Sequence, residues 1–201
     1  MNVGAVVAAA LADLDVIVER DPSVDSRVDA LLHPALPALW THRIAHGFYV
    51  GRRRRIAKAL SNCARLVSGG VEIHPGATLG RRVFIDHGAA VVIGETAEIG
   101  DDVTLFHQVT LGAVGWWRDD TRPPDARRHP VVGSGAVIGA GATVLGPVVI
   151  GDNALVGATS LVLTDVPAGG HTTPPVATIS AAGPRPRTTD TLQLVASTGC
   201  W

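Results

Sequence analysis

Two histidines stand beside charged residues, in an arrangement that suits acid–base chemistry. His87 follows Asp86, and His129 follows Arg128. An imidazole titrates near neutral pH, so it can accept a proton from a hydroxyl group. A nearby carboxylate can hold such a ring in one tautomer. These pairs predict a site in which a histidine activates a nucleophile.

The residues around these histidines repeat with a step of six. An apolar residue recurs thirteen times, usually with a small or β-branched residue two positions earlier and often with glycine one position later. A step of six suits neither a helix nor one long strand, but it suits short strands joined by tight corners. The apolar positions are Ile73, Leu79, Ile85, Ile93, Ile99, Leu105, Leu111, Val132, Ile138, Val144, Ile150, Val156 and Val162.

Three such repeats make one triangular coil, so residues eighteen positions apart should stack. Val132 is then expected on Ile150, and Ile138 on Val156. The pattern predicts a parallel β-helix filled with valine, isoleucine, leucine and alanine. A sandwich of alternating strands is the alternative, but it would not hold a six-residue phase over thirteen repeats.

Both histidines coincide with interruptions of the repeat. The phase slips by two residues around His87 and by fifteen residues before Val132, near His129. Extra residues must leave the prism as bulges or loops, where chemistry tends to lie on a rigid scaffold. A single histidine is more often a hydrogen-bonded corner residue, but the double coincidence favours catalysis. Glu72 precedes His87 by fifteen residues, close to one coil, so its carboxylate can approach the imidazole.

The rest of the chain flanks this repeat. Residues 1–68 are expected to form a small N-terminal helical domain, with helices near 4–20, 31–47 and 51–67. The β-helix is expected over 69–166, with an inserted loop at 113–130. Residues 167–201 are expected to form a largely irregular C-terminal tail, because they are rich in proline and threonine.

Bulk properties exclude several classes of partner. The net charge is −1 over 201 residues, so neither a nucleic acid nor an anionic membrane is implied. The two cysteines, Cys63 and Cys200, lack metal-site spacing, which favours a reducing cytoplasm without a disulfide. The apolar run near the N-terminus is too short to span a bilayer and lacks the basic flank of a signal peptide.

Several motifs together resemble the serine O-acetyltransferase family. The similarity covers roughly residues 15–165 and includes the helical region. Coils of this family are left-handed, so the resemblance implies a left-handed parallel β-helix with a small N-terminal α-helical domain. The motifs are Arg20-Asp21-Pro22, His42-Arg43-Ile44-Ala45-His46, Glu72-Ile73-His74-Pro75-Gly76, Phe84-Ile85-Asp86-His87-Gly88, Val92-Ile93-Gly94-Glu95-Thr96, Val109-Thr110-Leu111-Gly112 and Arg128-His129-Pro130.

The resemblance implies acetyl-CoA-dependent acetylation of the L-serine hydroxyl, which gives O-acetyl-L-serine for cysteine biosynthesis. His87 would be the general base, Glu72 would orient it, and His129 would complete the catalytic pocket. Asp21 and Asp86 would bind the substrate ammonium group, and Arg128 would bind its carboxylate.

The same resemblance implies acetyl-CoA as the co-substrate, without a metal, in a groove between neighbouring prisms. A homotrimer or a dimer of trimers is expected, because such a cleft is most easily completed by a second copy. The implied acetyl-CoA contacts are Gly112, Ala113, Ala140 and Ala158.

Departures from the family pattern leave alternatives open. Ala113-Val114 stands where the family has glycine and threonine, which adds bulk where the thioester should pass. The loop that follows contains Trp116-Trp117, which are expected either to pack on a neighbouring subunit or to cover the substrate. These changes keep open another hydroxy amino acid as the acceptor. Cysteine synthase is a possible partner, but Trp201 replaces the terminal isoleucine of family members that dock there.

Two further functions compete with acetyl transfer. A zinc-dependent β-helix hydratase would require three converging histidines, and the candidates are His74, His87, His107 and His129. A scaffold that only binds and regulates cysteine synthase would require an inactive site, which nothing in Glu72, Asp86 or His87 suggests.

Overall fold

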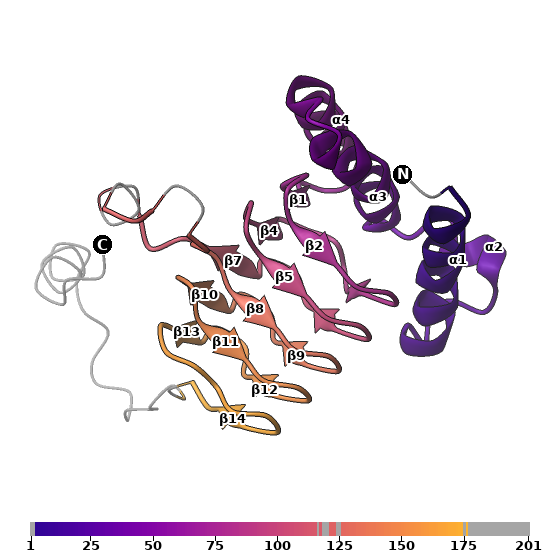
Figure 1. Cartoon of the computed structure of the whole chain (residues 1–201). Helices are drawn as coiled ribbons and strands as arrows, with labels where there is room; N and C mark the ends of the chain where they lie inside the picture. The colour runs from indigo at the N-terminus through magenta and orange to yellow at the C-terminus, as the bar shows by residue number, and fades with distance from the viewer. Residues whose placement is uncertain (1–2, 116, 118–120, 124–125, 175, 177–201) are drawn as a thin grey trace, which may run out of the picture.

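The computed structural model describes residues 3–115, 117, 121–123, 126–174 and 176. Within them, fourteen short strands wind into a three-sided prism. The four described helices precede the first strand and lie at the end of the prism that contains the first coil (Figure 1). Among the described helices, none is long and apolar enough to cross a membrane.

Each side of the prism is a parallel sheet that receives one strand from each coil. The first face contains β1 (Glu72–Ile73), β4 (Val92–Ile93), β7 (Thr110–Gly112), β10 (Thr143–Leu145) and β13 (Leu161–Val162). The second face contains β2 (Thr78–Leu79), β5 (Glu98–Ile99), β8 (Val131–Val132) and β11 (Val149–Ile150). The third face contains β3 (Phe84–Ile85), β6 (Thr104–Leu105), β9 (Val137–Ile138), β12 (Leu155–Val156) and β14 (His171–Thr172).

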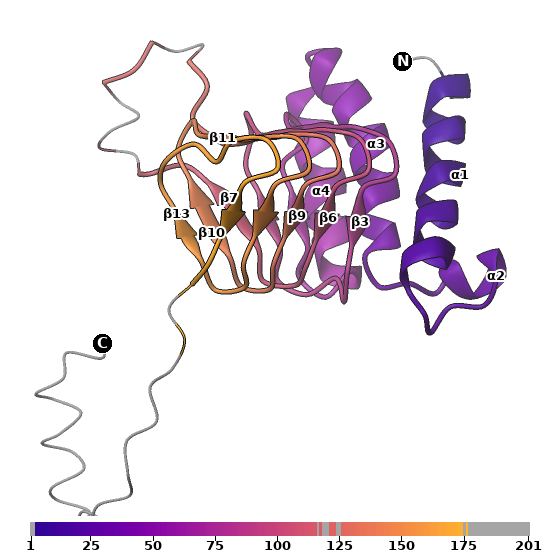
Figure 2. The ribbon, with the colours of Figure 1, turned by 90° about the horizontal axis from the view of Figure 1, so that it is seen from below.

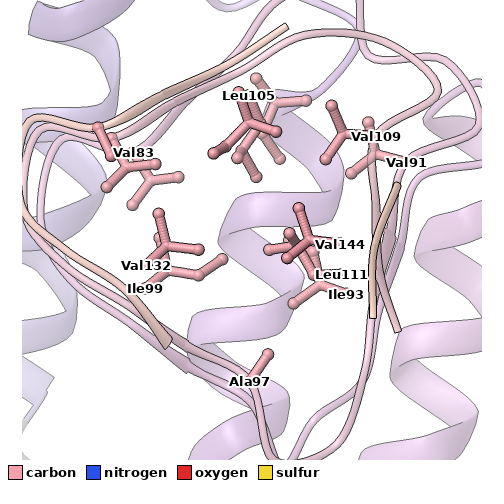
Figure 3. Packing of buried hydrophobic residues seen from close by; sticks show 14 of the residues in the cluster. Val83, Val91, Ile93, Ala97, Ile99, Leu105, Val109, Leu111, Val132 and Val144 are labelled. Carbon is pink, nitrogen blue, oxygen red and sulfur yellow. The ribbon is translucent and has the colours of Figure 1, made fainter. Parts of the chain in front are cut away.

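The predicted stacking is confirmed. Val132 pairs with Ile150, and Ile138 pairs with Val156. Most apolar positions of the repeat are almost fully buried and point into the prism (Figure 3). Burial of these branched side chains supplies the main favourable free energy of the coil, at roughly 25 cal/mol per Å² of apolar surface.

The two phase slips appear as changes in strand register. Ile85 pairs with Leu105, twenty positions away rather than eighteen, because two extra residues bulge between β3 and β4. Leu111 pairs with Val144 across the inserted segment that joins β7 to β8. Extra residues therefore leave the prism without displacing the buried positions.

Two corners of the prism matter for function. The segments that join the third face to the first are called the His87 corner: 86–91, 106–109, 139–142 and 157–160. The segments that join the first face to the second are called the Arg128 corner: 74–77, 94–97, 113–130 and 146–148. These corners lie at opposite ends of the first-face strands (Figure 2).

The helices are α1 (Val3–Arg20), α2 (Arg27–Ala30), α3 (Leu36–Val50) and α4 (Arg54–Val67). The short helix α2 was not expected from the sequence. The Ser26 side chain caps it by accepting from the main-chain nitrogen of Asp29. The third helix begins five residues later than expected, with a proline in its first turn.

Specific contacts fix the helices to the prism. Arg43 of α3 makes a two-pronged ion pair with buried Asp13 of α1 and also donates to the Gly80 carbonyl. Ser61 of α4 donates to the Ile73 carbonyl of β1. The helical region is therefore held against the first coils by buried polar contacts as well as apolar ones.

The prism continues past the repeat that the sequence revealed. Strand β14 pairs with β12, and the Gly157 amide donates to the Thr172 carbonyl. This strand was expected to be part of an irregular tail, because it lacks the apolar rung of the repeat. Its main-chain hydrogen bonds suffice to add it to the third face. The expectation for residues 177–201 lies outside the described residues.

Candidate active site

His87 lies in the bulge between β3 and β4. Its backbone has φ 60°, the left-handed region that is uncommon for residues with a side chain, and its side chain is 68% exposed. Its Nε2 atom lies 3.6 Å from Oδ2 of Asp86. An exposed imidazole beside a carboxylate, on a rigid corner, can accept a proton from a bound hydroxyl group.

Three other polar residues surround His87. The His107 ring meets the His87 ring edge to face, with centroids 5.3 Å apart. Asp21 at the end of α1 accepts hydrogen bonds from the Ser23 hydroxyl and amide, which lower the pKa of its carboxyl, and the His87 charge acts in the same direction. His33 is buried, and this burial lowers its pKa despite nearby Asp21 and Asp86.

The sequence singled out Asp21, Asp86 and His87, but it missed His33 as a neighbour of this group. Nothing in its spacing relates His33 to the six-residue repeat. Only the packing of its ring on Phe84 of β3, with centroids 5.7 Å apart, brings it to this corner.

Glu72 begins β1 and faces a different partner. Its Oε2 atom accepts a 2.8 Å hydrogen bond from Arg65 of α4, and both side chains are about half exposed. The expectation that Glu72 orients His87 therefore remains a prediction, and Arg65 competes for the same carboxylate.

Arg128 lies at the other corner, where the inserted segment returns to the prism. Its Nη2 atom donates to Glu95 Oε2 at 2.5 Å, and Tyr49 of α3 donates to Glu95 Oε1 at 2.5 Å. The hydrogen bond from Tyr49 is the main reason that the pKa of Glu95 is lowered. The guanidinium group of Arg54 lies 5.1 Å from the centre of the Tyr49 ring.

A cleft of about 570 Å³ opens beside this network. It is lined by helix residues on one side and by coil residues on the other, with three arginines among them. The lining residues are Tyr49, Arg54, Gly76, Thr78, Glu95, Thr96, Ala97, Glu98, Arg127 and Arg128.

His129 is buried beside the cleft, with 8% of its surface exposed. Its Nδ1 atom lies 2.9 Å from the Thr96 hydroxyl and 3.2 Å from the Thr96 amide nitrogen. The sequence missed Tyr49, Glu95 and Thr96 as partners of this pair, although Glu95-Thr96 is part of a motif that it identified.

The expected acetyl-CoA residues divide between the two corners. Ala140 and Ala158 stack at the His87 corner, where the Thr159 amide donates to the Ala140 carbonyl at 2.8 Å. Gly112 ends β7 and leads with Ala113 into the Arg128 corner. The four positions carry either no side chain or a single methyl group, and their contact with acetyl-CoA remains a prediction.

The candidate residues thus form two groups at opposite ends of the first-face strands. One group carries the expected base and the other carries the expected carboxylate ligand. The first contains Asp21, Asp86, His87, Ala140 and Ala158, and the second contains Gly112, Ala113, Arg128 and His129.

The histidines considered for zinc divide in the same way. His87 and His107 belong to the His87 corner, whereas His74 and His129 belong to the Arg128 corner. Within the described part of the chain, no three histidine, cysteine or acidic side chains gather as metal ligands would.

The inserted loop is described only in part. Trp117 is 60% exposed, and its indole lies over Gly115, where a Cβ atom would come within 2.5 Å of the ring. Trp116 lies outside the described residues. The choice between a subunit contact and a substrate cover therefore remains open.

Comparisons with known proteins agree with this architecture. Residues 129–164 match the family model described as bacterial transferase hexapeptide, six repeats. Serine acetyltransferase of Helicobacter pylori is 46% identical over 157 residues, which cover 78% of this chain and 87% of that protein. The Bacillus licheniformis enzyme of the same name is 48% identical over 156 residues, covering 77% of this chain and 68% of the relative.

Solved structures give the same result. Neisseria gonorrhoeae serine acetyltransferase in complex with serine superposes with a TM-score of 0.77 at 37% identity, covering 88% of this chain and 69% of that one. The Brucella abortus enzyme in complex with coenzyme A superposes with a TM-score of 0.73 at 34% identity. The match covers 81% of this chain and 62% of that one. The prediction of a left-handed parallel β-helix preceded by helices is confirmed.

Proposed function

This chain belongs to the serine acetyltransferase family, and on that premise we propose how its residues carry out the reaction. The enzyme transfers the acetyl group of acetyl-CoA to the hydroxyl of L-serine, which yields O-acetyl-L-serine and CoA. This reaction is consistent with a role in cysteine biosynthesis. The observation that carries the residue assignment is the gathering of His87, Asp86 and Asp21 at one exposed corner.

His87 acts as the general base. It takes the proton of the serine hydroxyl while that oxygen bonds to the thioester carbonyl carbon. When the carbon–sulfur bond breaks, the protonated His87 returns its proton to the departing thiolate of CoA. Main-chain amides near the bound thioester stabilise the oxyanion that forms between these two steps.

Charged residues at both corners hold the amino-acid part of serine. Asp86 and Asp21 bind the ammonium group beside the base, and the lowered pKa of Asp21 keeps that carboxylate ionised. Arg128 binds the carboxylate, and Glu95 holds one of its nitrogen atoms at 2.5 Å. Glu72 orients His87 after the Glu72 carboxylate gives up its hydrogen bond with Arg65.

One active site is built from two copies of the chain. The base and the carboxylate ligand belong to opposite ends of the first-face strands, so both can meet one serine molecule when the His87 corner of one copy faces the Arg128 corner of another. In three copies related by a three-fold axis, each His87 corner faces the Arg128 corner of a neighbouring copy, so all three sites are complete. A homotrimer, or two trimers joined through their helices, is therefore the proposed assembly.

Acetyl-CoA occupies the groove between two copies. Ala140 and Ala158 border it from one copy, and Gly112 and Ala113 border it from the next. When bound, this co-substrate supplies the activated acetyl group. The chain supplies small side chains and main-chain polar groups that admit the thioester without steric conflict.

A related acceptor is the second candidate for the substrate. The exposed Trp117 over Gly115 favours it, because an indole in the loop after β7 would change the shape of an acceptor pocket beside that loop. We place the enzyme in the cytoplasm because its cysteines suit a reducing compartment. Docking to cysteine synthase is a separate proposal.

One assay tests the proposed function. Release of the CoA thiol is followed with acetyl-CoA and serine, homoserine or threonine as acceptors. The highest kcat/KM is expected for serine. A preference for another hydroxy amino acid would transfer the assignment to that acceptor, and the absence of thiol release with all three would reject acetyl transfer to hydroxy amino acids.

A further inference from the structure

We infer that Thr96 is a positioning residue that fixes the tautomer of His129 and thereby makes His129 a hydrogen-bond donor to the substrate carboxylate. The state of the imidazole is a property of the free protein. Only the identity of the acceptor rests on the proposed function.

Thr96 contacts His129 through both its main chain and its side chain. The Thr96 amide nitrogen lies 3.2 Å from His129 Nδ1, and the Thr96 hydroxyl oxygen lies 2.9 Å from the same atom. That hydroxyl also accepts from the main-chain amides of Arg128, at 2.9 Å, and of His129, at 3.1 Å. One threonine therefore holds both the end of the inserted segment and the ring.

The chemistry of these groups decides where the ring proton lies. A peptide N–H can only donate, so the Nδ1 atom that faces it must offer its lone pair. The Thr96 hydroxyl receives two amide hydrogens on its oxygen, so its own hydrogen is available for Nδ1. Two donors thus converge on Nδ1, and in the neutral ring the proton must be on Nε2.

Packing fixes the orientation of the ring as well. The His129 imidazole lies against Gly94, where a Cβ atom would come within 1.9 Å of Cδ2 and 2.1 Å of Nε2. No side chain fits at position 94 while the ring keeps this place. Because the ring is almost fully buried, Thr96 and Gly94 together leave it little freedom to flip.

The two histidines of the site therefore have different tasks. The neutral His129 ring has its Nδ1 lone pair engaged and its Nε2 protonated, so it cannot accept the serine proton. Its Nε2–H is a donor at the same corner as the Arg128 guanidinium group. We assign this donor to the carboxylate that Arg128 binds, and the task of base falls to His87 alone.

Nitrogen-15 NMR of the full-length protein without substrate tests the first step. The His129 signals are assigned by their loss in His129→Gln. We expect one neutral tautomer with the proton on Nε2 in the wild type and in Thr96→Ser. In Thr96→Val the amide donor to Nδ1 is kept, but the hydroxyl donor and its hold on the Arg128 and His129 amides are lost, so we expect a measurable share of the other tautomer. A wild-type His129 protonated on Nδ1 overturns the inference, whatever the activity of the protein.

Kinetics test the second step. We expect Thr96→Val to raise KM for serine by about tenfold, the effect of weakening one hydrogen bond to a charged group, while kcat and KM for acetyl-CoA change less than about twofold. Thr96→Ser should restore the wild-type KM. Gly94→Ala, which displaces the ring without changing Thr96, should raise KM for serine in the same way.

The outcomes separate the two steps. If Thr96→Val changes the tautomer but not KM for serine, His129 is not a donor to the carboxylate. If the wild type acetylates no hydroxy amino acid, the proposed function fails while the NMR result still decides the tautomer. If neither the tautomer nor KM responds to Thr96→Val, Thr96 has no positioning role.

Discussion

At the scale of single residues, His87 depends on an uncommon backbone conformation. Its φ of 60° costs roughly 1 kcal/mol for a residue with a side chain, and the next residue, Gly88, has φ 55° and lies against Ala35. The hydrogen bonds of the surrounding coils hold this conformation. The bulge places the imidazole outside the prism instead of in its core.

Removal of this imidazole should abolish most of the activity. We expect His87→Ala to lower kcat by about 10²–10⁴, the usual effect of losing a general base. Steady-state kinetics with serine measure it. His171→Ala, which removes an exposed histidine of β14, is the matched control and should leave kcat unchanged. If His87→Ala keeps more than about a third of the wild-type kcat, another residue is the base.

Tyr49 should act on substrate binding through Glu95 and Arg128. Loss of the hydroxyl in Tyr49→Phe removes the 2.5 Å hydrogen bond to Glu95, so the carboxylate that orients Arg128 becomes less constrained. We expect KM for serine to rise by about fivefold, equivalent to one hydrogen bond of about 1 kcal/mol, with kcat nearly constant.

Phe48→Leu, which changes the neighbouring residue of α3 without touching Glu95, serves as the control for Tyr49→Phe. An equal rise in KM in both variants would point to a general disturbance of the helix. An unchanged KM in Tyr49→Phe would show that Glu95 holds Arg128 without help from α3.

At the scale of elements, one buried ion pair joins α1 to α3. Asp13 is fully buried and Arg43 nearly so, and Arg43 also reaches the Gly80 carbonyl of the prism. Burial raises the pKa of Asp13 despite the hydrogen bond from Arg43. This pair therefore ties the helices to the second face, and the same contact keeps α1, with Asp21 after its end, in place.

Breaking the pair should destabilise the fold. We expect Arg43→Met to lower the free energy of unfolding by about 3 kcal/mol, because Asp13 is left buried without its partner. Urea denaturation measures it. Arg27→Met, which breaks an exposed pair with Asp15, is the control and should cost at most about 1 kcal/mol. A similar loss in both variants would contradict the special role of the buried pair.

The cost of Arg43→Met should depend on pH. The folded-state pKa of Asp13 is already above its ordinary value, and loss of Arg43 removes the group that lowers it. The folded state then binds a proton more readily than the unfolded state, so stability falls as pH rises through the folded-state pKa. The cost should therefore be smaller at pH 5 than at pH 8.

The loop after β7 offers a test of its own. Trp117→Ala removes an exposed indole that lies over Gly115. If the indole covers the substrate, KM for the acceptor should change while the oligomer stays intact. If it packs on a neighbouring copy, dissociation at low protein concentration should appear first in light scattering. No change in either measurement would make the loop a tolerated surface insertion.

At the scale of the whole molecule, the two corners predict activity that is shared between copies. We expect mixed trimers of His87→Ala and Arg128→Ala subunits to recover about a third of wild-type activity, because a mixed trimer of either composition pairs an intact base with an intact arginine at one of its three sites. Co-expression with two different tags isolates such oligomers. Each variant alone should remain nearly inactive.

Two outcomes would contradict this arrangement. Mixed oligomers without recovered activity would place the whole site within one copy. An active monomer in light scattering would exclude a site shared between subunits. Either result would require the His87 and Arg128 corners of one chain to serve the same substrate, across the width of the first face.

The sequence by itself determined the coil and the chemical types at its corners. The six-residue period reports which residues are buried, and burial of Ile138 on Val156 follows from that period alone. The interruptions mark where the chain must leave the prism, so the spacing alone singles out His87 and His129. The roles given to them remain predictions, supported by motif similarity and by geometry.

Only the tertiary structure decided which side chains meet. Tyr49 and Glu95 are 46 positions apart, and Glu95 and Arg128 are 33 apart, yet they form one network. The pairing of Glu72 with Arg65 and the hold of Thr96 on His129 are equally invisible in the spacing. A repeat fixes the direction of each side chain relative to the core. Contacts between coils and helices depend on how the segment between β7 and β8, and the helices α3 and α4, fold back onto the prism. The six-residue pattern does not encode these positions.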